Sequence, residues 1–136
     1  MHILVVGGGM GGTILANNLA RRLSGELEQG SSKITMLSAT DKHMYQPGLL
    51  YVAVGKMSTT ELYRDQKSLL EPSIDFHVDP VEKFDMDNNS VTTKSGKKIS
   101  YDILCIATGS RGNAAGIPGL AENACQFYTE ADALAM

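Results

Sequence analysis

Three glycines near the start of the chain have the spacing of a turn that binds a diphosphate. Gly7, Gly9 and Gly12 lie in the run GGGMGG, which follows the apolar run ILVV and precedes a stretch with helical periodicity. The first glycine allows a tight turn, the second lets the backbone approach a phosphate, and the third lets the helix pack against the strand. Backbone N–H groups and the positive end of the helix dipole favour the anion. The spacing predicts dinucleotide binding, with a purely structural turn as the alternative.

The cysteines and two aspartates are the other residues that could carry chemistry. Cys125 is a candidate redox thiol, and an unreactive cysteine is the alternative, because only a thiolate is reactive. Cys105 lies within an apolar run and is interpreted as a small core residue. Asp85 and Asp87 are explained by turn formation at the following asparagines, so no metal site is predicted.

Composition limits the classes of protein that the chain can belong to. Its 136 residues, 43% of them hydrophobic and 20% charged, are typical of one globular domain with little left for a second. A net charge of −3 gives no reason to expect nucleic acid as a partner. No apolar run approaches about 18 residues, so no membrane span is expected. Two cysteines form no disulfide framework, and we expect a cytoplasmic setting.

The elements that must position the glycine turn form a strand–helix–strand unit. The apolar residues 3–6 predict a strand, residues 13–23 a helix, and residues 33–37 a second strand with Ser38 at its carboxyl end. Residues 24–32 are expected to be a polar connection. The expected apolar face of the helix consists of Ile14, Leu15, Leu19 and Leu23.

The rest of the chain predicts further strands of the same sheet and a small inserted one. A short helix capped by Ser58 or Thr59 is expected to continue towards Leu70 and to end before Pro72. Residues 74–78 predict a third parallel strand, and about 80–100 a small antiparallel β-meander. Residues 101–107 predict a buried strand, and Asp132 the start of a helix.

These elements predict an α/β, Rossmann-like fold whose parallel strands end at one edge. Gly7, Ser38 and the Thr108-Gly109 pair should therefore converge at one crevice. A nicotinamide site would carry an acidic residue after the second strand, where this chain has Ser38 and Ala39. Serine can still donate and accept a hydrogen bond there.

Several segments in order resemble one known family. The sequence resembles the N-terminal part of the flavoproteins with two dinucleotide-binding domains. It is most similar to sulfide:quinone oxidoreductase and flavocytochrome c sulfide dehydrogenase, with type 2 NADH dehydrogenases as near relatives. The segments that carry the resemblance are VVGGGMGG (5–12), YQPGLLYVAVG (45–55), YDILCIATGS (101–110), IPGL (117–120) and FYT (127–129).

The resemblance implies FAD as the cofactor and assigns it a set of residues. It implies a reduced sulfur donor and a quinone as partners of the complete enzyme, with type 2 NADH:quinone dehydrogenase chemistry as an alternative. His43 would be a surface-loop residue or would face the edge of the flavin. The implied contacts are Gly7, Gly9, Met10 and Gly12 with the pyrophosphate, Ser38 and Ala39 with the adenosine ribose, Val81 with adenine, Gln46 and Pro47 with the isoalloxazine ring, and Thr108 and Gly109 beneath the cofactor.

The chain also departs from the pattern of that family. Its members are usually more than twice as long, with a second dinucleotide-type domain and a membrane-facing C-terminal region. Thr129 stands where sulfide-oxidising members carry a cysteine, four residues after Cys125. We therefore predict a partial FAD-binding domain at 1–111, then a linker and the start of a truncated second domain at 112–136. Little turnover is expected, membrane contact is expected only through absent segments, and a non-catalytic or self-associating nucleotide-binding module is the further alternative.

Overall fold

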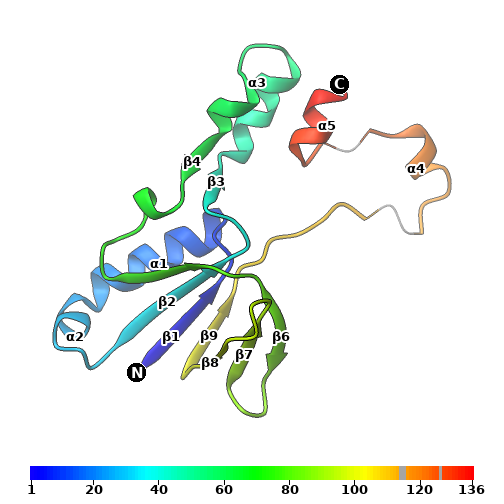
Figure 1. Cartoon of the computed structure of the whole chain (residues 1–136). Coiled ribbons are helices and arrows are strands. Elements are labelled where there is room, and N and C mark those ends of the chain that lie inside the picture. Colours follow the sequence, from blue (N-terminus) through cyan, green and yellow to red (C-terminus); the bar gives the residue numbers. More distant parts are fainter. Residues whose placement is uncertain (114–115, 126) are drawn as a thin grey trace. The chain divides into compact units, whose positions relative to one another are not determined.

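The computed structural model describes residues 1–113, 116–125 and 127–136 (Figure 1). The chain folds into two compact units, which are described separately. The first contains residues 1–43 and 65–109, and the second contains residues 44–64 and 110–136. The predicted division into domains at residue 111 stays a prediction.

The first unit is built on a four-stranded parallel sheet with the order β5-β2-β1-β9. Val6 at the end of β1 pairs with Leu37 on one side and with Ile106 on the other. The three parallel strands predicted around the glycine turn are thereby confirmed. The strands are β1 (His2–Val6), β2 (Lys33–Ser38), β5 (Ile74–Val78) and β9 (Ile103–Ile106).

The fourth strand is not the buried strand that its composition predicts. β9 pairs only with β1 in the sheet order, and Ile103 and Ile106 are 45% and 53% exposed. Every residue of β1 after His2 is buried. An apolar run therefore does not distinguish a central strand from an edge strand, because that difference depends on which neighbours pair with it.

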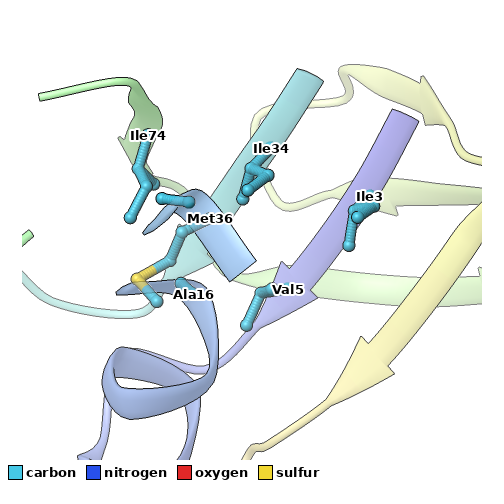
Figure 2. Close-up of a cluster of buried hydrophobic side chains, with 7 residues drawn as sticks. Ile3, Val5, Ala16, Ile34, Met36 and Ile74 are labelled. Carbon is cyan, nitrogen blue, oxygen red and sulfur yellow. The ribbon is translucent and has the colours of Figure 1, made fainter. Parts of the chain in front are cut away.

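One face of the sheet is covered by helix α1 (Met10–Arg22), as Figure 2 shows for part of this core. The predicted apolar face of this helix is wrong in part. Ala16 and Ala20 are buried against the sheet, whereas Ile14 and Leu15 are exposed. Small side chains let the helix approach the sheet closely, and Leu19 and Leu23 of the predicted face pack against the same cluster. The sheet contributes Ile3, Val5, Ile34, Met36 and Ile74 to this cluster.

The segment after α1 also differs from the prediction. Helix α2 (Ser24–Glu28) occupies part of the expected polar connection. Leu27 packs against the core beneath α1, which gives this short helix an apolar anchor. A single leucine within a polar stretch leaves no periodic signal, and tertiary packing decides the outcome.

The opposite face of the sheet is covered by the predicted meander, which is confirmed. Its strands are β6 (Val81–Asp85), β7 (Ser90–Thr93) and β8 (Lys98–Ser100), in antiparallel order. Val91 and Ile99 of the meander pack with Leu4, Val6 and Leu37 of the large sheet. Alternate residues of β1 and β2 thus face α1 and the meander, as the two-residue period of a strand requires.

Two short strands, β3 (Lys42–Met44) and β4 (Tyr63–Asp65), pair with each other. The helix predicted from Ser58 to Leu70 is wrong, because β4 interrupts it. Ser58 does cap a 3₁₀ helix at Thr59–Leu62, in a reciprocal pair with Glu61. A second 3₁₀ turn follows at Lys67–Leu69.

The second unit has a small core of its own. Leu49 and Val52 of α3 (Leu49–Ala53) pack with Leu62 and with Ala133 of α5 (Glu130–Leu134). Helix α5 begins two residues before the predicted start, because Thr129 caps it by bonding to the backbone N–H of Asp132. The unit also contains α4 (Leu120–Asn123) and a 3₁₀ turn at Gln46–Gly48. Among the described residues, no helix is long and apolar enough to cross a membrane.

Candidate functional site

The ends of three strands meet at the glycine turn. The N–H of Gly7 donates to the carbonyl of Leu37 at 2.8 Å, and the N–H of Ala107 donates to the carbonyl of Val6 at 2.7 Å. Gly7 has a φ of +116°, and a Cβ added there would lie 2.2 Å from the carbonyl oxygen of Ala107. Only glycine fits such a position. The structure therefore brings Gly7 and Thr108 together at the carboxyl edge, as predicted.

The third glycine of the pattern lets helix and strand pack together. A Cβ on Gly12 would lie 1.9 Å from the carbonyl oxygen of Gly7. The first turn of α1 thus rests directly on the end of β1, as the spacing predicts. This contact fixes the direction in which the helix leaves the sheet.

The middle glycine faces open space. A Cβ on Gly9 would meet no atom within 4 Å, and Gly9 is the N-cap of α1 without any side-chain cap. Among the residues that the structure describes, none accepts a hydrogen bond from the N–H of Gly9, Met10 or Gly11. The first turn of α1 also contains no acidic residue. A thirteen-residue helix therefore presents free donors and its positive end at an open surface.

Two predicted ribose contacts lie at the end of β2. Ser38 is buried, and its hydroxyl accepts a hydrogen bond from the N–H of Thr40 at 3.3 Å. A Cβ on Gly8 would lie 2.6 Å from this hydroxyl, so Ser38 is packed against the glycine turn. Ala39 is exposed beside it. The placement agrees with the prediction, and the contact with ribose stays a prediction.

The other predicted contacts of the first unit follow strand ends as well. Val81 begins β6 and packs against the cluster that contains Val6 and Leu37. Gly109 follows Thr108 with a φ of +82°, a conformation that favours glycine. Their proposed contacts with adenine and with the underside of the cofactor stay predictions.

A buried polar group beneath the turn was missed by the sequence interpretation. Gln66 has no exposed surface, and its amide donates to the hydroxyl of Thr13 at 2.8 Å. His43 is half-buried, not a free surface-loop residue, and its Nδ1 lies 3.1 Å from both Gly8 O and Gln66 Oε1. Polar residues on segments far apart in the sequence leave no periodic signal, so only the tertiary structure reveals this cluster.

The remaining predicted site residues belong to the second unit. The side-chain amide of Gln46 donates to the carbonyl of Tyr128 at 3.3 Å, and Pro47 lies in the first turn of a 3₁₀ helix. Cys125 is exposed and is not in a disulfide. The predicted places of Gln46 and Pro47 near the isoalloxazine ring, and the candidate role of Cys125, stay predictions.

Two tyrosines of this unit have shifted pKa values. The hydrogen bond that the hydroxyl of Tyr63 donates to Glu130, 2.5 Å long, raises the pKa of Tyr63 together with burial. The hydrogen bond with Ser110 lowers the pKa of Tyr128, and the bond with Gln46 acts in the same direction. These contacts hold the segments 44–64 and 110–136 together within the unit.

Several known proteins are similar to this chain in sequence. The sequence profile of the pyridine nucleotide-disulphide oxidoreductase family matches residues 1–136. The sulfide-quinone reductase of Aquifex aeolicus is 37% identical over 134 residues, which are 98% of this chain and 30% of that protein. A type II NADH:quinone oxidoreductase of Staphylococcus epidermidis is 28% identical over 126 residues, which are 92% of this chain and 30% of that protein.

A solved structure of a similar protein has the same fold. The X-ray structure of the sulfide:quinone oxidoreductase from Aquifex aeolicus matches with a TM-score of 0.78 and 33% identity, over 98% of this chain and 30% of that chain. The predicted family resemblance and the Rossmann-like fold are confirmed. The chain spans about 30% of the length of these relatives.

The described residues fit a bound dinucleotide. A diphosphate needs donors that no protein acceptor already uses and space for its oxygens, and the turn around Gly9 offers both. The hydroxyl of Ser38 still has a hydrogen to donate while it accepts from Thr40. The glycine turn could thus hold the diphosphate of a dinucleotide such as FAD.

Proposed function

Because the chain belongs to the pyridine nucleotide-disulphide oxidoreductase family, we propose that it is the FAD-binding portion of a sulfide:quinone-type oxidoreductase. FAD is the cofactor of this family and of its sulfide:quinone reductase members. When bound, the flavin would carry electrons from a reduced sulfur compound to a quinone. The proposal puts the complete enzyme at the periphery of a membrane, because quinones are lipid-soluble.

The observation that carries the proposal is the set of free donors around Gly9. The N–H groups of Gly9 and Met10 would bind the diphosphate oxygens, and the dipole of α1 would favour their charge. Ser38 and Ala39 would hold the adenosine ribose. These residues bind and orient the cofactor and do not themselves exchange electrons.

The electron donor and acceptor belong to the same proposal. The sulfide-quinone reductase of Aquifex aeolicus is the more similar of the two relatives, at 37% identity against 28% for the type II NADH:quinone oxidoreductase. This difference favours reduced sulfur over NADH as donor. Because the chain spans about 30% of those relatives, we propose that these 136 residues alone bind FAD but reduce quinone slowly.

A matched pair of substitutions tests the proposed FAD site. Gly9→Ala adds a methyl group that no protein atom touches, so the fold should not change. The methyl group would occupy the space proposed for the diphosphate, and FAD binding should therefore weaken. Loss of charge-assisted hydrogen bonds corresponds to about a 10- to 100-fold weaker affinity. Gly11→Ala is the control, because its Cβ also meets no atom within 4 Å and the glycine pattern leaves this position free.

The measurement is a titration of FAD that follows the quenching of flavin fluorescence by the full chain. We expect wild type and Gly11→Ala to bind within about twofold of each other, a difference of only a few tenths of a kcal/mol. Absence of binding by the wild-type chain would refute the proposal. Equal weakening by the two substitutions would instead exclude the backbone of Gly9 as the phosphate contact.

A further inference from the structure

The carbonyl of Gly8, within the glycine turn, is held on the inner side of that turn by two side chains. The hydroxyl of Thr13 donates to this oxygen at 3.2 Å, and Nδ1 of His43 lies 3.1 Å from it. Thr13 is buried and His43 is half-buried. The oxygen therefore has two side-chain partners on elements that are far apart in the sequence.

Gln66 joins these two side chains and fixes the direction of each hydrogen bond. Its Nε2 donates to the hydroxyl of Thr13 at 2.8 Å, and its Oε1 lies 3.1 Å from Nδ1 of His43. Since Gly8 O and Gln66 Oε1 can only accept, Nδ1 of His43 must carry a hydrogen. Thr13 accepts from Gln66, which leaves its own hydrogen for the carbonyl of Gly8.

The position of Gln66 is itself well determined. Its side chain has no exposed surface, and its backbone N–H donates to the carbonyl of Asp41 at 2.8 Å. A buried amide with all of these bonds made is expensive to move, because a new position would leave polar atoms without partners. The network is thus a rigid support for one peptide group.

The peptide that it holds joins Gly8 to Gly9. A trans peptide is planar, and its C=O and N–H point in opposite directions. A carbonyl held by Thr13 and His43 therefore turns the N–H of Gly9 away from those side chains, at a residue that is exposed. Two adjacent glycines impose little conformational restriction of their own, so this peptide could otherwise rotate.

We propose that Thr13, His43 and Gln66 are positioning residues that lock the Gly8–Gly9 peptide with its N–H directed at the diphosphate. This inference rests on the proposed FAD site. If the peptide rotated, it would present a carbonyl oxygen to an anion instead of a donor. The network thus raises affinity for the diphosphate without touching it.

Pairs of substitutions separate this role from general stability. Thr13→Val and His43→Leu each remove a donor to Gly8. Thr13→Ser keeps the hydroxyl, and His43→Asn puts an amide N–H close to the place of Nδ1. The probes are ADP, which carries the diphosphate, and adenosine, which does not, titrated into the full chain by calorimetry.

If these residues position the Gly8–Gly9 peptide, their substitution should weaken only the contact with the diphosphate. We expect Thr13→Val and His43→Leu to weaken ADP binding about 3- to 10-fold, as for the loss of one neutral hydrogen bond. Adenosine binding should stay unchanged, and Thr13→Ser and His43→Asn should restore the affinity for ADP. Equal losses for ADP and adenosine would overturn the lock while leaving the proposed function intact. A wild-type chain that binds ADP no better than adenosine would overturn the proposed function and the lock together.

A second measurement needs no ligand. A carbonyl carbon that loses hydrogen bonds shifts upfield in its ¹³C resonance. The resonance of the Gly8 carbonyl should move upfield in Thr13→Val and His43→Leu, and should stay in place in Thr13→Ser and His43→Asn. An unchanged resonance in all four variants would show that the network does not hold this peptide.

Discussion

Two glycines at turns, one in each unit, have different uses in this molecule. Gly9 begins helix α1, and a Cβ there would meet nothing within 4 Å. Gly48 ends the 3₁₀ turn at Gln46–Gly48, and a Cβ there would lie 2.5 Å from the side chain of Leu62. Gly48 makes room for the protein's own core, whereas Gly9 leaves room for something outside the protein. A glycine with no room for a side chain is thus needed for packing, whereas an open one such as Gly9 is available for binding.

The helix starts also differ in whether a side chain caps them. Helix α5 and the 3₁₀ helix at Thr59–Leu62 are capped by side chains of their own, Thr129 and Ser58. Helix α1 has no side-chain cap at Gly9. A side-chain cap would occupy the N–H groups that an anion needs. The uncapped start of α1 therefore leaves its N–H groups available for an anion.

The largest expected loss of stability is at Gly12, where packing allows no side chain at all. Gly12→Ala would force a Cβ to within 1.9 Å of the backbone oxygen of Gly7, so helix and strand must separate. We expect the free energy of unfolding to fall by about 3 kcal/mol or more in urea denaturation. Gly11→Ala should instead raise it by up to about 1 kcal/mol, since alanine favours helix. A stable Gly12→Ala chain would mean that the turn is not packed as described.

A smaller loss is expected at Gly48. Gly48→Ala should lower the free energy of unfolding by about 1 to 2 kcal/mol, because the end of the flexible Leu62 side chain can move aside in part. Shortening its neighbour with Leu62→Val should relieve the clash. The double variant should then lose less than the sum of the two single losses. Additive losses would show that Gly48 does not make room for Leu62.

Removal of a side-chain cap tests the second part of the comparison. Thr129→Ala should destabilise the start of α5 by about 1 kcal/mol, because the N–H of Asp132 loses its acceptor. The amide of Ala133, which donates to the carbonyl of Thr129, should then exchange with solvent about fivefold faster. Thr129→Ser keeps the hydroxyl and should exchange at the wild-type rate. Equal rates in all three chains would exclude a capping role.

The smallest effect is expected at the amino end of the sheet, opposite the glycine turn. Burial lowers the pKa of His2 below its ordinary value of 6.5, and the charge of Lys33 acts in the same direction. As the pH falls below 6.5, the unfolded chain therefore binds a proton before the folded chain does, and folding stability decreases until the folded pKa is passed. His2→Gln should reduce this dependence in thermal unfolding between pH 7 and about 5, the range in which histidine titrates. The same pH dependence of thermal unfolding in wild type and His2→Gln would contradict this prediction.

Local sequence patterns were sufficient to predict the glycine turn, the parallel strands and the meander. A strand, a glycine pattern and a helix start are contiguous in residues 2–22, so their geometry follows from covalent connection and steric limits. The exposed edge of β9, the small buried face of α1 and the interruption by β4 were not predictable in this way. Each depends on which distant segment packs or pairs with the element.

The sequence by itself determined that a helix starts directly after a strand through three spaced glycines, and hence that a diphosphate could be held there. Only the tertiary structure decided that Thr13, His43 and Gln66 meet beneath that turn. The reason is physical. A glycine's conformational freedom is a property of the residue and its immediate neighbours. A buried hydrogen-bond network exists only after segments distant in the chain have packed together.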